Sequence, residues 1–402
     1  MTKANQNHPL DAVIVSAVRT AVGKAKKGSL ADTRAEDLGR AVLRAAVDRV
    51  PGLAYGDVQD VVIGCAMPEG EQGLNFARIM TLYAGFPVTT PAVTVNRFCA
   101  SGLQAIAYAA ERIRLGEAEV VLAGGVESMS HVPMTGFKLS PHPGIADAMP
   151  EVYMGMGHTA EEVARRYGIS REAQDAFAAA SHAKAAAAQA AGRFSEEIVP
   201  LHVQREGVDD NGRPWSRSFV FDSDEGVRAD TTPEVLVKLK PSFAREGTVT
   251  AGNASQMSDG AAAVVIMSRE RAEQLGVKPL AVFRAYSVAG VAPEVMGIGP
   301  IEAIPKALAR ASVGLEQVKL FELNEAFAAQ CLPIVQRLGI NPELVNVNGG
   351  AIALGHPLGC TGTKLSVSLI HELQRRGGGF GMVSMCVGGG MGAAGVFEVP
   401  PA

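Results

Sequence analysis

The sequence predicts an α/β fold built from two similar halves, with a further segment inserted between them. Short runs rich in β-branched residues alternate with longer stretches that have the apolar spacing of a helix. Glycine is abundant, at 45 of 402 residues, and aromatic residues make up only 5%, which suits many tight strand-to-helix turns. Residues 259–266 and 391–398 share the pattern Gly-Ala-Ala-x-Val, which indicates an internal repeat.

The first half is predicted to begin with a strand and to alternate between strands and helices. Its last strand would be residues 259–266, which lie beyond the inserted segment. The preceding elements are expected to be a strand at 11–17, a helix at 37–50, a strand at 58–64, a helix at 101–115 and a buried strand at 119–124, ended by two glycines.

The second half repeats this order. It is expected to contain an opening strand at 279–289, an inner strand at 318–323, a helix at 361–376, a strand at 380–385 and a last strand at 391–398. A chain of 402 residues is too long for one ordinary core, and its 47% of hydrophobic residues can fill two or three. The strand and helix order predicts a parallel type of α/β architecture.

The segment between the halves has a different composition. It holds a proline- and glycine-rich stretch, a helical run at 159–191 and a polar stretch at 205–230. Because its helices carry apolar faces, we expect a loop or lid domain and not a linker. The predicted division is residues 1–129 with 252–278, then 130–251, then 279–402.

Composition and charge exclude several classes of protein. The formal net charge of −4 argues against a nucleic-acid binder with a generally basic surface. Residues 1–9 lack the apolar core of a signal peptide, and no apolar run is long enough for a membrane span. Five scattered cysteines without a Cys-x-x-Cys pair predict free thiols, no zinc site and a cytoplasmic location.

The best candidate for a nucleophile is Cys99, in Asn-Arg-Phe-Cys-Ala-Ser-Gly at residues 96–102. It lies between a predicted strand and the start of a helix, where free backbone N–H groups and the helix dipole favour the thiolate. This position and the small residues that follow, Ala100, Ser101 and Gly102, favour a functional cysteine. The alternative interpretation is a buried structural cysteine.

Two glycine-rich segments of the second half carry further candidates. His356 stands between a glycine and a proline, in a segment too apolar for an ordinary surface histidine, and could accept the proton of a thiol. Cys386 ends a predicted strand, and the turn after it could direct N–H groups at an oxyanion. Residues 388–393 also fit Gly-x-Gly-x-x-Ala, but no complete βαβ unit follows, so a dinucleotide site is rejected.

A fourth segment, residues 321–330, contains Asn324 and Glu325 inside an otherwise apolar run. Burying such polar side chains is costly unless they line a site or cap a helix. Capping of the following helix by Asn324 is the alternative to a role in a site.

Taken together and in this order, these motifs resemble the thiolase family. The matching segments are Asn96 to Gln104, Gly-Asn-Ala-Ser at 252–255, Asn-Glu-Ala-Phe at 324–327, Gly-His-Pro at 355–357 and Cys-Val-Gly-Gly-Gly at 386–390. The resemblance covers essentially the whole chain and implies a five-layered αβαβα core of two halves, with a loop domain over the active site. The related ketoacyl synthases normally lack the second cysteine.

The resemblance also implies roles for the candidate residues. Cys99 would attack the 3-keto carbon of a 3-ketoacyl-CoA, His356 would accept its proton, and Cys386 would protonate the departing acetyl-CoA enolate and later activate CoA. One oxyanion hole would consist of His356 and a water molecule held by Asn324. The other would consist of the backbone N–H groups of Cys99 and Gly388.

For substrate binding, the resemblance implies that Ser255 lines the pantetheine tunnel, that Met156 lies beside the acyl chain, and that Phe327 belongs to the binding site. Coenzyme A would be a substrate, with no bound cofactor and no metal. The expected assembly is a homodimer or homotetramer, or a subunit of a β-oxidation multienzyme complex.

The degradative branch of the family is favoured by Asn-Arg-Phe-Cys and by Gly155, where the short-chain biosynthetic branch commonly has histidine. Glycine at this position would leave room for longer acyl chains. The alternatives are a biosynthetic acetoacetyl-CoA thiolase and a non-catalytic binder of acyl-CoA or of the sterol-carrier type.

Overall fold

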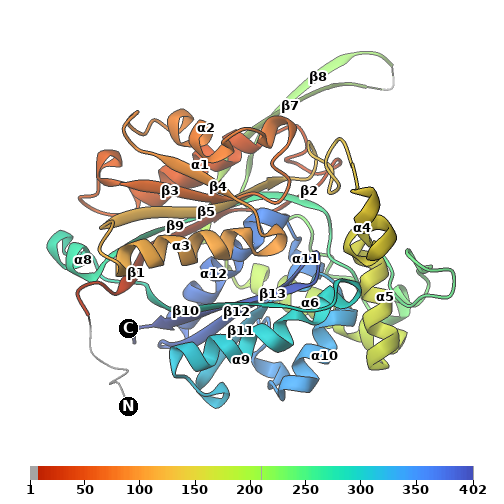
Figure 1. Cartoon of the computed structure of the whole chain (residues 1–402). Coiled ribbons are helices and arrows are strands. Elements are labelled where there is room, and N and C mark those ends of the chain that lie inside the picture. The colour runs from red at the N-terminus through yellow and green to blue at the C-terminus, as the bar shows by residue number, and fades with distance from the viewer. Residues whose placement is uncertain (1–7, 210, 402) are drawn as a thin grey trace.

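The computed structural model describes residues 8–209 and 211–401, and its largest element is an eleven-stranded sheet (Figure 1). Nine strands follow the order β11-β12-β13-β10-β1-β9-β5-β3-β4, while β2 pairs with β9 and β6 pairs with β1. The strands are β1 (Ala12–Thr20), β2 (Gly23–Lys24), β3 (Asp60–Gly64), β4 (Ala92–Val95), β5 (Val120–Ser128), β6 (Ile198–Val199), β9 (Ser258–Ser268), β10 (Ala281–Gly290), β11 (Val318–Leu323), β12 (Gly379–Val387) and β13 (Met391–Val399).

The strand order confirms the predicted duplication. Reading outward from the centre, the first half runs β1, β9, β5, β3 and the second runs β10, β13, β12, β11. Within the sheet, the two halves join at a short antiparallel junction, where Val13 pairs with Val282 and Ile14 with Ala281. The prediction of a parallel architecture was wrong in part. Strand β3 is parallel to β4 and β5, and β11 is parallel to β12. Strand β9, however, is antiparallel to β1 and β5, and β13 is antiparallel to β10 and β12.

Helices and the two halves of the sheet form five layers, as Figure 1 shows from top to bottom. The outer helices are α1 (Ala35–Asp48) and α2 (Phe76–Tyr83) on one side, and α9 (Gly299–Ala311) and α10 (Ala328–Leu338) on the other. The middle layer consists of α3 (Ser101–Arg114) and α12 (Leu358–Arg375). Of the 18 residues of α12, 15 are buried, whereas α1 buries 7 of 14, because only a middle helix is covered on all sides.

Close contact between α3 and α12 depends on glycine. A Cβ atom at Gly102 would lie 2.7 Å from Thr363 N, and one at Gly362 would lie 2.3 Å from Leu103 N. Neither position could hold a larger residue without separating the helices. Since α3 follows Cys99 and α12 follows His356, this contact brings the two motifs together at one end of the middle layer.

The segment from 130 to 251 contributes helices and a hairpin beside the layers. Its elements are α4 (Pro143–Ala148), α5 (Met156–Tyr167), α6 (Arg171–Ala190), β7 (Leu201–Val208), β8 (Pro214–Phe221) and α7 (Pro233–Leu236). The expected helical run is broken at Gly168, whose φ of 65° ends α5. The polar stretch forms the β7–β8 hairpin, which projects from the body (Figure 1). Two short helices, α8 (Arg269–Leu275) and α11 (Ala351–Leu354), complete the structure.

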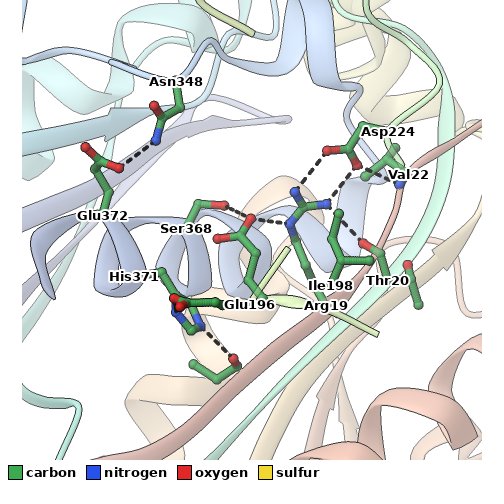
Figure 2. Close-up of polar contacts among 12 residues, drawn as sticks. Arg19, Thr20, Val22, Glu196, Ile198, Asp224, Asn348, Ser368, His371 and Glu372 are labelled. Atoms are coloured by element: carbon green, nitrogen blue, oxygen red, sulfur yellow. Dashed lines mark hydrogen bonds and ion pairs between the residues drawn. The ribbon is translucent and has the colours of Figure 1, made fainter. Parts of the chain in front are cut away.

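A buried ion cluster joins this segment to the layers (Figure 2). Arg19, on β1, donates to Glu197 at 2.6 Å and to both oxygens of Asp224 at 2.8 and 2.9 Å. Glu197 also accepts a hydrogen bond from Ser368 of α12, at 2.9 Å. One guanidinium group therefore holds two separate parts of the inserted segment against β1, and Glu197 connects them to the middle layer. Among the described residues, no helix is long and apolar enough to span a membrane.

Candidate active site

Cys99 lies in a tight turn between β4 and α3. The turn contains a 3-10 helix, Phe98–Ala100, and Phe98 has a φ of 43°, which is uncommon for a residue other than glycine. Asn96 Oδ1 accepts from the N–H of Phe98 at 2.8 Å, and Ser101 Oγ accepts from the N–H of Arg97 at 2.8 Å. These side chains hold the turn in a strained shape that presents the thiol at the start of a helix.

The imidazole of His356 faces this thiol. His356 Nε2 lies 3.3 Å from Cys99 Sγ and 3.3 Å from Asn324 Nδ2. Gly355, with a φ of 90°, turns the chain before the histidine, and the N–H of His356 is held by Gln256 O and Ser258 Oγ. Cys99 thus lies within hydrogen-bonding distance of a histidine that is 257 positions further along the chain, and that histidine also contacts Asn324.

Burial decides the protonation of this pair. It lowers the pKa of His356 to about 3, with a further contribution from the positive charge of Lys364. It also raises the pKa of Cys99 to about 12, although the backbone N–H groups of Cys99 and Gly388 act in the opposite direction. The N–H groups of the turn favour the thiolate, as predicted, but desolvation outweighs them, and the shifted pKa values correspond to a thiol beside a neutral imidazole.

A second thiol, Cys386, is fully buried at the end of β12. Burial raises its pKa, and the neighbouring Cys99 thiol raises it further. In the turn that follows, the N–H of Gly388 faces the sulfur of Cys99, together with the N–H of Cys99 itself. Gly389 and Gly390, with φ of 80° and 88°, shape this turn. The arrangement supplies two backbone donors near one sulfur and a second thiol beside it.

An apolar cluster lies next to Gly388. Met156, at the start of α5, and Phe327, before α10, pack in one cluster with Cys386. A Cβ atom at Gly388 would lie 3.5 Å from Met156 Sδ and 3.6 Å from the ring of Phe98. A side chain at Gly388 would therefore contact both of these apolar side chains.

The segment that contains Ser255 runs between the other motifs. Ser255 donates its N–H to Ala326 O at 2.9 Å, Ala254 forms a bridge with Phe327, and Met257 forms one with His356. Ser255 is partly exposed, and its backbone hydrogen bond leads to the Asn-Glu-Ala-Phe segment and not to Cys99. A side chain at Gly155 would meet His158 Nδ1 at 3.3 Å.

The polar residues Asn324 and Glu325 do not cap α10. That helix begins at Ala328, and its N-cap residue is Phe327. Asn324 faces His356, as described above. Glu325 is buried and accepts hydrogen bonds from Ser181 Oγ at 2.6 Å and Asn346 Nδ2 at 2.8 Å, so it anchors the segment that leads to His356. The capping interpretation is therefore wrong.

Sequence reasoning missed Glu127, near the end of β5. Its buried carboxylate accepts from the N–H groups of Ala66 at 2.7 Å and Gly359 at 2.8 Å, and from Gln72 Nε2 at 2.7 Å. Burial raises its pKa, and these donors oppose the shift. Glu127 thereby fixes the loop that follows His356. The signal in the sequence was an acidic residue inside a buried run, three residues after the predicted strand end.

Reasoning from the sequence also missed Thr361, whose hydroxyl oxygen lies 2.6 Å from His356 Nδ1.

All five cysteines are free thiols. Within residues 8–209 and 211–401, no group of three or more His, Cys, Asp or Glu side chains is arranged to hold a metal ion.

Known proteins resemble this chain over almost its whole length. Residues 12–270 match the family "Thiolase, N-terminal domain", and residues 277–399 match "Thiolase, C-terminal domain". A 3-ketoacyl-CoA thiolase of Bacillus subtilis is 59% identical, over 97% of this chain and 99% of its own. An acetyl-CoA acetyltransferase of Chromobacterium violaceum is 46% identical, over 97% of this chain and 100% of its own.

Among solved structures, the dimeric peroxisomal thiolase of Saccharomyces cerevisiae superimposes with a TM-score of 0.88 at 38% identity, covering 99% of this chain and 100% of its own. The family match, the relatives and the fold agree with the motifs of Asn324, His356 and Cys386 that meet around Cys99. The chain belongs to the thiolase family.

Proposed function

We propose that this protein is a degradative 3-ketoacyl-CoA thiolase, which uses CoA to cleave a 3-ketoacyl-CoA into acetyl-CoA and a shortened acyl-CoA. The observation that carries the proposal is the placement of Cys99 Sγ, 3.3 Å from His356 Nε2 and facing the N–H groups of Cys99 and Gly388. A nucleophile, a base and donors for an oxyanion are the parts that acyl transfer requires. A non-catalytic binder has no use for this arrangement.

In the first half of the reaction, the thiol proton of Cys99 passes to His356 Nε2 as the sulfur adds to the 3-keto carbon. The bond between C2 and C3 then breaks, and the electron pair forms the enolate of acetyl-CoA. Cys386 gives its proton to the enolate carbon, which leaves an acyl thioester on Cys99 and a thiolate on Cys386. His356 and a water molecule on Asn324 would stabilise the enolate oxygen.

In the second half, the thiolate of Cys386 takes the proton of a fresh CoA thiol, and the CoA sulfur attacks the acyl thioester. The raised pKa of Cys386 makes its thiolate a strong base for this step. The N–H groups of Cys99 and Gly388 stabilise the tetrahedral oxyanion, and loss of one such donor typically costs about 2.7–4 kcal/mol of barrier. The bond between the acyl carbon and Cys99 Sγ then breaks, and the sulfur takes back the proton that His356 Nε2 received in the first half.

The apolar side chains beside Gly388 support binding of acyl chains longer than the acetoacetyl group. Met156 and the ring of Phe98 lie next to this glycine, and a side chain at Gly155 would meet only His158 within 4 Å. Phe327 lies in the same apolar cluster as Met156, and Ser255 would contact the pantetheine arm. The second candidate function is a biosynthetic acetyl-CoA acetyltransferase, the activity named for the relative from Chromobacterium violaceum.

We also propose a homodimer as the basic assembly. One edge strand of the sheet is β4, whose Val93 is 43% exposed, and the structural neighbour from Saccharomyces cerevisiae is a dimeric thiolase. A tetramer or a subunit role in a β-oxidation complex would build on that dimer. The free cysteines suit a reducing compartment such as the cytoplasm. The division at residues 130 and 251 is supported by β9, which returns to the first half after the inserted segment.

The test is thiolysis of a series of 3-ketoacyl-CoA substrates by the purified protein, from acetoacetyl-CoA to 3-ketooctanoyl-CoA and longer. Comparable kcat/KM for four- and eight-carbon substrates supports the degradative function. Activity with acetoacetyl-CoA alone would instead favour the biosynthetic enzyme. Inactivity with the whole series, with CoA esters still bound, would reject both.

A further inference from the structure

The first turn of α12 places a hydroxyl group behind the catalytic imidazole. Thr361 Oγ1 lies 2.6 Å from His356 Nδ1, on the side of the ring opposite to Cys99. The same oxygen lies 3.0 Å from Pro357 O, four residues earlier, and donates its hydrogen bond there. Threonine hydroxyls in helices commonly bond this carbonyl. A hydroxyl has one proton, so Oγ1 must accept at its contact with the ring.

His356 carries only one ring proton in the resting protein. The ring is buried, and Lys364, whose side chain is itself fully buried, lies three residues beyond Thr361 on the same face of α12. Burial and this neighbouring positive charge both disfavour the imidazolium form. In a neutral imidazole, one nitrogen donates and the other accepts, and the surrounding groups decide which is which.

We propose that Thr361 is a positioning residue that holds His356 in the tautomer protonated on Nδ1, so that the lone pair of Nε2 is directed at Cys99. Both neighbours of Nε2 agree with this tautomer, because the thiol of Cys99 and the amide nitrogen of Asn324, each 3.3 Å away, can donate to it. The inference rests on the proposed function for the role of the pair in thiolysis. It concerns the protonation of the ring before any substrate binds.

The consequence for the first step is direct. When Cys99 attacks, the thiol proton moves to Nε2 while the sulfur forms its bond to the keto carbon, and the ring becomes an imidazolium whose Nδ1–H still donates to Thr361. In the opposite tautomer Nε2 already carries a proton and cannot accept another. Without the hydroxyl, nothing in the first turn of α12 selects between the two forms.

Three substitutions on α12 separate this role from a structural one. Thr361→Val removes the hydroxyl and keeps the shape of the side chain, and Thr361→Ser keeps the hydroxyl. Thr363→Val is the matched control, since Thr363 Oγ1 is buried on the same helix without a hydrogen-bond partner among the described residues. Each variant is compared with the parent by circular dichroism and by binding of acetyl-CoA.

The first readout is the rate at which iodoacetamide alkylates Cys99 at neutral pH, which requires no turnover. We expect Thr361→Val to lower this rate, and kcat for thiolysis, by about 10–100-fold with KM little changed, the range found when the hydrogen-bond partner of a metal-binding histidine is lost. Thr361→Ser and Thr363→Val should stay within about threefold of the parent. An unchanged rate in Thr361→Val, or an equal loss in Thr361→Ser, would overturn the proposal.

A second measurement needs no altered Thr361. In protein labelled with ¹⁵N-histidine, the ring signals of His356, assigned by their loss in His356→Asn, should report a proton on Nδ1. A proton on Nε2 would contradict the inference even if Thr361→Val failed to fold. Because neither readout depends on turnover, a parent without thiolase activity would reject the proposed function and leave the tautomer to be decided separately.

Discussion

Replacing Arg19 by methionine should strongly destabilise the fold. The guanidinium group is 1% exposed and makes three short hydrogen bonds, at 2.6 Å to Glu197 and at 2.8 and 2.9 Å to Asp224 (Figure 2). Both carboxylates are as deeply buried as the arginine. Methionine retains the apolar stem, so the main effect is two buried carboxylates without their cation.

The expected magnitude follows from this burial. Breaking a buried ion pair by removing one partner costs about 3–5 kcal/mol, because the remaining charge stays in a medium that solvates it poorly. If the urea dependence of the free energy of unfolding is about 3 kcal/mol per molar, the unfolding midpoint should fall by roughly 1 M. The triple variant Arg19→Met, Glu197→Gln, Asp224→Asn should recover most of the loss, since no charge is then left unpaired.

The assay is urea unfolding followed by circular dichroism, with Arg165→Met as the control. Arg165 forms a surface ion pair with Glu162 and is 71% exposed, so its replacement should leave the midpoint unchanged within error. A loss below about 1 kcal/mol in Arg19→Met, or a triple variant weaker than the single one, would refute the reasoning that buried charge holds the inserted segment in place.

Four further predictions concern the site. Gly388→Ala should fold normally, because the atoms nearest to its methyl group would be 3.5 Å away, but it should lose thiolysis, because that methyl group would occupy the position proposed for the acyl chain. Gly390→Ala, as the contrast, should destabilise the protein, since its Cβ would lie 2.3 Å from a carbonyl oxygen at a φ of 88°. The rate of Cys99 alkylation should show no titration step between about pH 6 and 9, because the pKa of the thiol is raised to about 12 and the thiolate forms only at higher pH. A step in that range would contradict a neutral pair of thiol and imidazole. Glu127→Gln should lower kcat and lower the free energy of unfolding by roughly 1–3 kcal/mol. The reason is that an amide NH2 group would then face backbone N–H groups that now donate to the carboxylate. Dialysis against EDTA should leave activity unchanged, and loss restored by a metal would contradict the expected metal-free chemistry.

Much of the fold was accessible from the sequence because hydrophobic periodicity is a local property. The strand at 318–323 was predicted with its observed bounds, and the helix at 101–115 extends one residue too far. The strand predicted to end at Gly124 continues to Ser128. Its two glycines were interpreted as a turn, but they serve close packing: Cβ atoms there would lie 2.6 Å from Ala262 O and 2.2 Å from Gly359 O. Sequence alone does not distinguish these uses of glycine.

Within the site, the motif residues Cys99, His356 and Asn324 were found, since each stands out from its apolar surroundings. The groups that hold them were not. Glu127 holds residues that are far from it in the sequence, such as Gly359. Thr361 lies in the first turn of a helix, where a threonine gives no sign of a special role. The direction of the Cys99 pKa shift was also missed, because desolvation depends on every element packed around the thiol and has no local signal.

The central claim is that Cys99 carries the acyl group between the two halves of the reaction. It is tested by mixing the protein with 3-ketooctanoyl-CoA in the absence of free CoA, quenching in acid, and measuring the protein and its peptides by mass spectrometry. The account predicts one hexanoyl group on the peptide that contains Cys99, lost on addition of CoA and absent in Cys99→Ala. An acyl group on Cys386, or thiolysis by Cys99→Ala at the rate of the parent, would contradict it.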